Sequence, residues 1–343
     1  MAQNRLATVA APHITSPLTT RKIMVAVTIA LCPTLVASAF IFGLRVLLLA
    51  GVTVASCVIF EYLYQLVLKK PITIGDFSAV VTGLILAFNL PPAFPLWMAC
   101  IGSFVAIVIT KQLFGGIGFN FANPALVGRI VLQLGFPAQM MQYTYPASVS
   151  GGPEALASAT PLAVLRNGSV PLIDLLLGTH GGTMGETVAV TLILGGVALI
   201  LFKVMSASIP VVYIGGTFVL KFLLDFGTGA AAGGFGSAVS GAGLYAWNAM
   251  LWVLSGGLLL GAFFMATDYV TSPYTLKGKI VFGIGLAVIT VAIRTWSHTT
   301  EGVSYAILIM NLLVPFINSI CLQKPLGATR QMSKKRRANK EVA

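Results

Sequence analysis

Long apolar runs separated by short polar connections dominate the chain. A run of about 20 mainly apolar residues is long enough to cross a lipid bilayer as a helix. The pattern predicts about ten transmembrane helices, with approximate limits 23–43, 46–68, 77–96, 97–114, 124–136, 187–205, 209–225, 247–267, 280–296 and 303–322. The third span is interrupted early by Asn89-Leu90-Pro91-Pro92, and the fifth is short.

Composition excludes a soluble protein. Hydrophobic residues make up 57% of the chain and charged residues 9%, which is too few charges to cover a soluble domain of 343 residues. Backbone groups in lipid must be paired within their own segment, so we expect an all-α polytopic membrane protein. The first apolar run lacks a convincing cleavage site and should remain as the first helix.

The basic residues predict an orientation. With the N-terminus in the cytoplasm, 17 of the 21 basic residues face inside, among them Lys111 and Arg129. The remaining four, Arg45, Arg166, Lys221 and Arg294, lie outside or are buried. This distribution follows the positive-inside rule and places both termini in the cytoplasm. The net charge of +12 is explained by topology and by contact of the basic tail with membrane lipid, so nucleic acid binding is not expected.

The spans divide the chain into five parts. These are a cytoplasmic arm (1–22), a first transmembrane half (23–136), an outer-face loop (137–186), a second transmembrane half (187–322) and a basic tail (323–343). A Gly- and Ala-rich connection (227–243) also falls on the outer face.

An internal repeat of five plus five spans is suggested by two similar segments. Gly83 to Pro92 resembles Gly261 to Pro273, and five spans separate them, so the two halves would be inverted relative to each other. The third and eighth helices would each stop at a Pro-containing break, one near each face. Chance similarity between two Gly-rich apolar helices is the competing explanation.

Acidic residues are rare, and four of them fall within or at the ends of spans. Ionisable groups there suggest an ion pathway or a paired site, and Asp225 and Asp268 are the candidates with the most apolar neighbours. Lys221, one helical turn before Asp225, is a plausible ion-pair partner. The alternative for all four acids, Glu61, Asp76, Asp225 and Asp268, is a place at the headgroup level, and Asp76 is also explained as a cap of the third helix.

Several familiar cofactor sites are not predicted. Cys32, Cys57, Cys100 and Cys321 form no close pair, so no iron–sulfur cluster or zinc site is expected from this chain alone. The three histidines lack ligand spacing, and the sequence contains neither a Walker sequence nor a Gly-x-Gly-x-x-Gly after a strand.

A small hydroxyl-bearing segment, Ser158-Ala159-Thr160-Pro161, lies within the outer-face loop. On local pattern alone Thr160 reads as a helix N-cap, with Pro161 at the first helical position.

Three longer stretches of sequence, taken together with this segment, point to a known family. They are DFSAVVTGLILAFNLPP (76–92), KQLFGGIGFNFANPALVGR (111–129) and ATDYVTSP (266–273). Together with the Thr160 segment they closely resemble the family that contains the D subunit of the Rnf electron-transport complex and the B subunit of the sodium-pumping NADH:quinone reductase. The resemblance spans nearly the whole chain, and the short N-terminal arm fits the Rnf branch better.

The resemblance implies a flavoprotein component of an ion-translocating ferredoxin:NAD oxidoreductase in the bacterial cytoplasmic (inner) membrane. FMN would be linked through its phosphate to Thr160, flanked by the small residues Ser158 and Ala159, with Arg166 near the remaining phosphodiester charge. A second, noncovalent flavin, riboflavin, is expected among the helices. Partner subunits would supply the nicotinamide site, the iron–sulfur centres and a second FMN, and would be needed for activity. The alternative function is a secondary transporter or channel without flavin, whose central site lies between inverted repeats.

Overall fold

The computed structural model describes residues 18–143, 161–165, 170–297 and 302–322, and all regular elements in these ranges are helical. The helices longer than one turn are α1 (Thr20–Phe42), α2 (Arg45–Val67), α3 (Ser78–Phe88), α4 (Leu96–Phe104), α5 (Pro124–Gly135), α9 (Leu172–Leu177), α10 (Ala189–Leu201), α11 (Ser208–Ser240), α12 (Ala242–Leu254), α14 (Leu276–Trp296) and α15 (Val303–Ile320). Short elements are η1 (Ile74–Asp76), α6 (Pro137–Met140), α8 (Pro161–Val164) and α13 (Leu258–Leu260). The π-helical segments η2 (Val105–Gln112) and η3 (Gly261–Met265) continue α4 and α13.

These helices confirm the predicted fold class. By length and composition, five described helices are able to cross a membrane, and α12 with α13–η3 adds a sixth, bent candidate. Four shorter apolar helices, among them α3 and α5, account for the remaining predicted spans. α3 is apolar on every side, and ten of its eleven residues are buried, as expected for a helix enclosed by others.

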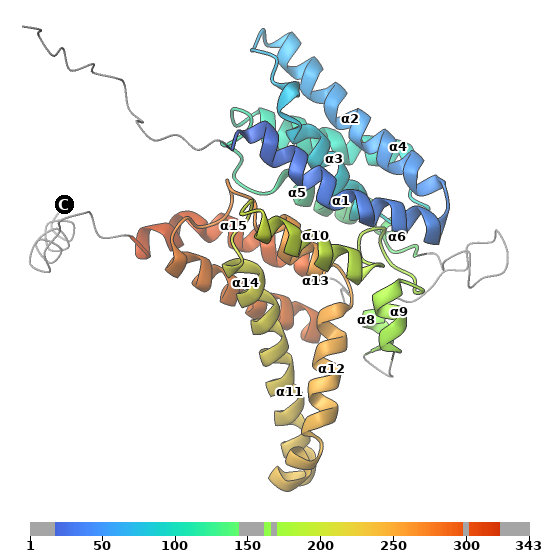
Figure 1. Cartoon of the computed structure of the whole chain (residues 1–343), viewed down its shortest axis with the longest axis vertical. Coiled ribbons are helices and arrows are strands. Elements are labelled where there is room, and N and C mark those ends of the chain that lie inside the picture. The colour runs from blue at the N-terminus through green and yellow to red at the C-terminus, as the bar shows by residue number, and fades with distance from the viewer. Residues whose placement is uncertain (1–17, 144–160, 166–169, 298–301, 323–343) are drawn as a thin grey trace, which may run out of the picture.

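Three element boundaries differ from the prediction. α3 ends at Phe88 instead of reaching 96, because Asn89 and the two prolines after Leu90 end the helix. The Gly- and Ala-rich connection 227–243 is wrong as a loop: α11 continues through it with a kink at Gly234, and α12 follows at once. α11 and α12 therefore form a long helical hairpin that projects from the rest of the molecule (Figure 1).

The eighth predicted span is also broken in its middle. Its two parts, α12 and α13–η3, meet at an angle of 66° across Ser255, Gly256 and Gly257. Gly256 has a φ of +69°, a conformation that an L side chain rarely adopts. The break thus lies well before Pro273, where the sequence suggested it.

The inverted repeat stays a prediction, but its two breaks lie differently than expected. The Asn89 amide nitrogen is 3.5 Å from the Met265 sulfur, so the ends of α3 and η3 meet inside the molecule instead of lying one near each face. The 11 residues of α3 span only about 16 Å, roughly half of a hydrocarbon core.

The predicted outer-face loop extends deep into the protein at its C-terminal end. Residues 180–187 are all buried, and the backbone N–H groups of Met184 and Gly185 donate to the carbonyl oxygens of Leu90 and Phe88. This segment satisfies carbonyl groups at the end of α3 that have no partner within the helix. The part of the loop that enters the core was missed because a polar loop was expected to lie on the surface.

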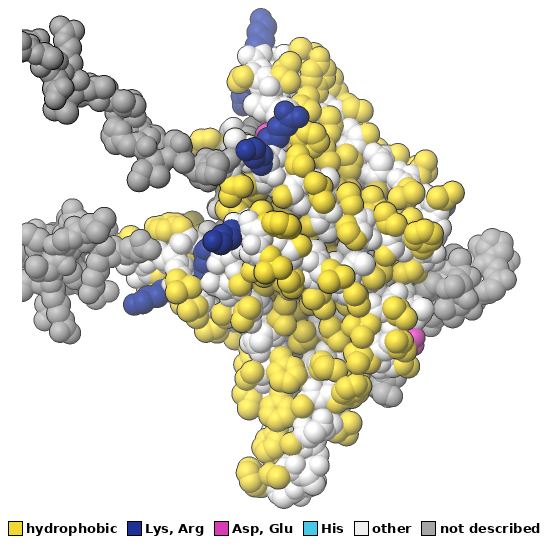
Figure 2. All heavy atoms as spheres, in the orientation of Figure 1, with side chains coloured by type: hydrophobic (Ala, Val, Ile, Leu, Met, Phe, Trp, Pro, Cys, Tyr) yellow, Lys and Arg dark blue, Asp and Glu magenta, His cyan; other side chains and the backbone are white. Residues whose placement is uncertain are grey.

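Exposed basic residues gather where α1 begins, α2 ends and α14 begins (Figures 1 and 2). We call this the basic end, and its described exposed members are Arg21, Lys22, Lys69, Lys70, Lys203 and Lys277. α1 begins and α15 ends on this same side (Figure 1). Two members of the predicted inside set, Lys111 and Arg129, are only 2% exposed and bind polar groups in the interior.

Candidate functional site

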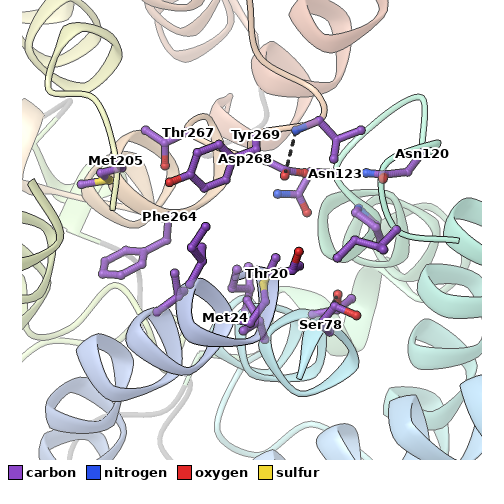
Figure 3. A pocket seen from close by; sticks show the side chains of 18 of the residues that line it. Thr20, Met24, Ser78, Asn120, Asn123, Met205, Phe264, Thr267, Asp268 and Tyr269 are labelled. Atoms are coloured by element: carbon purple, nitrogen blue, oxygen red, sulfur yellow. Dashed lines mark hydrogen bonds between the residues drawn. The ribbon is translucent and has the colours of Figure 1, made fainter. Parts of the chain in front are cut away.

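A cavity of about 380 Å³ opens at the basic end, between the two transmembrane halves. We call it the basic-end cavity. Its apolar walls come from α1, α3, η3 and the end of α10, with Met24, Ile85, Phe264 and Met205 among the lining residues (Figure 3). Ligand pockets in proteins are typically about 300–1,000 Å³, mostly apolar, with a few polar groups that orient the ligand. This cavity has both the size and the character of such a pocket.

Polar groups come from the loops before α5 and after η3, with Asn120, Asn123 and Asp268, and from the opposite wall, with Thr20 and Ser78 (Figure 3). Asn123 caps α5 by accepting from the Ala125 N–H, and its amide donates to the Met265 carbonyl oxygen at 3.2 Å. Asp268 accepts from the Val270 N–H at 3.3 Å. Burial raises the pKa of Asp268, and the hydrogen bonds that it accepts oppose this shift.

A saturated ion pair lies behind one wall of the basic-end cavity. The Lys111 ammonium group, which lines the cavity, is 2.9 Å from both carboxylate oxygens of Glu61 and donates to the Ser78 hydroxyl at 2.6 Å. Gln112 donates to Glu61 Oε1 at 2.8 Å. Glu61 is fully buried, and its pairing with Lys111 agrees with the paired site that the sequence suggests for acids within spans. Lys111 lies in a π-helical segment, and such segments are frequent at functional sites.

A second cavity, of about 490 Å³, lies between α11, α12 and the residue after α8. We call it the hairpin cavity. Lys221 and Asp225 form the ion pair that the sequence predicts, at 2.6 Å, and Lys221 lies 5.3 Å from the centre of the Trp252 ring. Tyr245 and Asn248 add polar groups from α12. This cavity is more polar than the basic-end cavity.

In the sequence, the predicted flavin attachment segment lies next to residues that line the hairpin cavity or pack near it. Ser158, Ala159, Thr160 and Arg166 lie outside the described residues. α8 begins at Pro161, as the helix-start pattern predicts, and Leu162 packs against Trp252 of α12 and Val291 of α14. Leu165, five residues after Thr160, lines the cavity itself.

The two predicted ion-pathway acids are not brought together. Asp225 lies in the hairpin cavity and Asp268 in the basic-end cavity. Asp76 accepts hydrogen bonds from the Ser78 N–H and hydroxyl at 2.8 and 2.6 Å, so it caps the start of α3.

Sequence reasoning missed several polar residues of the interior, namely Asn120 and Asn123 of the basic-end cavity and the buried residues Asn89, Arg129 and Glu186. A signal was present in the first two, which precede the start of α5 at a spacing of three residues. The others gave none, because their partners are distant in sequence.

Comparison with known proteins identifies relatives along nearly the whole chain. Residues 7–327 match the family described as NQR2, RnfD, RnfE. The chain is 40% identical to the D subunit of the Na(+)-translocating ferredoxin:NAD(+) oxidoreductase complex of Acetobacterium woodii, a match that covers 96% of this chain and 98% of that protein. It is 38% identical to the D subunit of the proton-translocating ferredoxin:NAD(+) oxidoreductase complex of Clostridium ljungdahlii, with 93% and 95% covered. The D subunit of the ion-translocating oxidoreductase complex of Stutzerimonas stutzeri is 35% identical, with 89% and 92% covered.

Proposed function

Because the chain belongs to the NQR2, RnfD, RnfE family, we propose that it is the membrane-embedded D subunit of a complex that transfers electrons between ferredoxin and NAD and moves ions across the membrane. The family match and the relatives named as D subunits of such complexes support this assignment. The other subunits contribute the nicotinamide site, the iron–sulfur centres and a second FMN, and this chain relays electrons through flavin.

FMN is attached to Thr160 through a phosphoester in this proposal. The observation that carries this step is the position of α8: Leu162, two residues after Thr160 in the sequence, packs against Trp252 and Val291, and Leu165 lines the hairpin cavity. The adjoining hairpin cavity has the size of a ligand pocket. Its polar residues Lys221, Tyr245 and Asn248 are the groups that would hold the flavin, with Arg166 near the phosphodiester.

The basic-end cavity is assigned to the noncovalent flavin, riboflavin. Its apolar walls suit a flat aromatic ring, and the amides of Asn120 and Asn123 with the carboxyl group of Asp268 suit the polar edge of that ring. A bound flavin supplies one-electron and two-electron redox chemistry, while the protein orients it, excludes water and tunes its potential. Phe264 and Met24 exclude water from the apolar side.

Asp225 and Asp268 remain the proposed acids of the ion pathway, each within its own cavity. Ionisable residues within or at the ends of transmembrane segments are expected to be functional by default. Asp268→Asn is expected to reduce ion movement driven by electron flow more than assembly. Unchanged ion movement in this variant would remove Asp268 from the pathway.

The proposed orientation places the basic end and both termini in the cytoplasm, with the attachment loop outside. An impermeant thiol reagent added from outside should label a cysteine introduced at Ala155 and leave one introduced at Ala338 unlabelled.

The proposed attachment is tested by removing one oxygen atom. Thr160→Val keeps the β-branched shape, and loss of a helix cap costs only about 1 kcal/mol, so the variant should assemble. The expected result is loss of the flavin fluorescence that stays with the wild-type polypeptide in denaturing electrophoresis. Thr160→Ser keeps a hydroxyl and should retain part of the signal.

Thr267→Val is the matched control, because it removes a threonine hydroxyl in the other cavity. It should keep all covalent flavin. If Thr160→Val still carries covalent flavin, the attachment is elsewhere and Thr160 is an N-cap only.

A further inference from the structure

A buried glutamate lies where the two transmembrane halves meet. The segment 180–187, which pairs with the end of α3, carries Glu186 into the interior, where its side chain is only 2% exposed. Arg129 from α5 lies beside it and donates to Asn89 Oδ1 at 2.7 Å and to the Ser304 hydroxyl at 2.8 Å. Asn89 follows α3, and Ser304 begins α15, so elements of both halves surround this acid.

The break in the eighth span adjoins the same acid. Gly257 begins the helix α13–η3, and a Cβ atom at this position would lie 3.2 Å from Glu186 Oε1. On the other side of the break, Arg294 donates to the carbonyl oxygens of Trp252 and Ser255 at 3.0 and 3.2 Å. A carboxylate at a helix start and a guanidinium group at a helix end both have favourable electrostatics. Discontinuous helices of this kind hold ion-binding sites in many transporters.

The carboxyl group of Glu186 is incompletely satisfied. Among the described residues, its Oε1 atom has no hydrogen-bond partner. The Arg129 Nη2 atom is 3.9 Å from Oε1, which is too long for a hydrogen bond. An ionised carboxylate in such a place is costly, because burial removes its water and the pairing replaces only part of it. A static, optimised ion pair therefore does not explain this residue.

Two other side chains of the segment 180–187 are also buried and incompletely paired. Within the described part of the chain, His180 Nε2 is buried and lacks a hydrogen-bond partner, and the buried Thr183 hydroxyl has none besides the neighbouring Glu186 carboxyl group. Gly182 has no side chain, so space remains between these groups: a Cβ atom at this position would lie 3.4 Å from Glu186 Oε2 and 3.7 Å from His180 Nδ1. Buried polar groups without protein partners are usually satisfied by ordered water. This cluster thus has the polar lining that a small hydrated site requires.

The charges around Glu186 determine which kind of cation this site is able to bind. Arg129 from α5 and Arg294 from α14 are the cations near Glu186, and their repulsion disfavours a bound metal cation. A proton is different, because it binds to the carboxylate covalently and removes the buried charge. Tyr143, which follows α6, is also buried nearby, and burial raises its pKa to about 12, so it stays neutral.

We propose that Glu186 is a proton-binding site at the junction of the two halves. Its carboxylate takes one proton from water, forms one O–H bond and becomes neutral, and the reverse step returns the proton to water. Thr183 and His180 connect it, through water, toward the end of α9. Burial raises the pKa of Glu186 above its ordinary value, and the positive charges of Arg129 and Arg294 oppose this shift. The proposal does not depend on flavin attachment.

Infrared difference spectroscopy after a pH jump tests it in the purified complex. The wild type should show the carbonyl band of a protonated carboxylic acid that titrates above the ordinary range of glutamate and shifts in heavy water. Glu186→Gln should lack this band. Asp225→Asn, which removes a partly exposed acid in the hairpin cavity, should keep it.

A second variant decides the matter even if Glu186→Gln does not assemble. Glu186→Asp keeps an acid on a shorter side chain, so the band should persist at a different frequency. Superimposable wild-type and Glu186→Gln spectra, or an Asp variant with an unchanged band, would overturn the proposal, because the titrating group would then be another residue.

Discussion

Glu61 and Glu186 are both buried glutamates beside a basic residue, yet their surroundings differ. Glu61 receives two contacts of 2.9 Å from Lys111 and a hydrogen bond of 2.8 Å from Gln112. Glu186 has its cation at 3.9 Å and an oxygen without a partner among the described residues. The Glu61 carboxylate is thus fully paired by its neighbours, whereas protonation lowers the energy of a buried carboxylate that is incompletely paired, as Glu186 is. The basic partner of each glutamate is distant in the sequence, so the sequence alone does not predict how completely either carboxyl group is paired.

The two buried glutamates are also expected to have different roles, one in stability and one in function. Glu61 joins α2 to η2 through Lys111, and Gln65 extends this network to Thr73. Glu186 lies on a segment without regular structure, between helix ends that have their own hydrogen-bond requirements. We therefore expect Glu61 to contribute mainly to stability and Glu186 to proton binding.

Removing the partner of Glu61 should have the largest effect. Lys111→Met leaves an uncompensated buried carboxylate and should reduce the free energy of unfolding by about 3–5 kcal/mol. Thermal unfolding of the purified complex measures this loss. The control is Lys221→Met, whose pair is about one fifth exposed and should contribute no more than about 1 kcal/mol. Combining Lys111→Met with Glu61→Met should restore most of the stability. Equal melting temperatures for the two single variants would contradict the structural role of the Glu61 pair.

The pH dependence of Glu186 should have an intermediate effect. Its pKa in the folded state is raised above the unfolded value of about 4.3. Between these two values the folded protein binds more protons than the unfolded chain, so stability falls as the pH rises and is regained below the unfolded pKa. The slope contributed is up to about 1.4 kcal/mol per pH unit. Melting curves between about pH 5 and 8 should show this slope in the wild type and a smaller one in Glu186→Gln. Parallel curves would contradict the assignment of this slope to Glu186.

Crowding Glu186 should have the smallest effect. Gly257→Ala brings a Cβ within 3.2 Å of Glu186 Oε1, so the carboxylate must shift by a few tenths of an ångström. We expect a loss of about 1 kcal/mol and a shifted acid band in the infrared spectrum. Gly215→Ala in α11 is the control: its Cβ would meet open space, and alanine should stabilise the helix by up to about 1 kcal/mol. An unshifted band in Gly257→Ala would argue against close contact between α13 and this acid.

Several features of the site were predictable because they are local. The Lys221–Asp225 pair follows from a spacing of four residues on one helix, and the start of α8 follows from Thr160-Pro161. The break after Phe88 follows from Pro91 and Pro92, although it lies earlier than the predicted limit. Each depends on residues within one or two helical turns of one another, so a pattern reports them.

The amino-acid sequence by itself determined the class of the protein, the apolar helices, the accumulation of basic residues at one end and the family. These properties depend on composition, period and local motifs, which need no partner from elsewhere in the chain. Only the tertiary structure placed Asp225 and Asp268 in separate cavities, bent the eighth span at Gly256 and Gly257, and brought Glu186 next to Arg129. Such neighbours come from helices far apart in sequence, and in a mostly apolar chain many packings satisfy the same hydrophobic pattern. Which buried polar groups meet, and which remain incompletely paired, was decided by the packing of the helices.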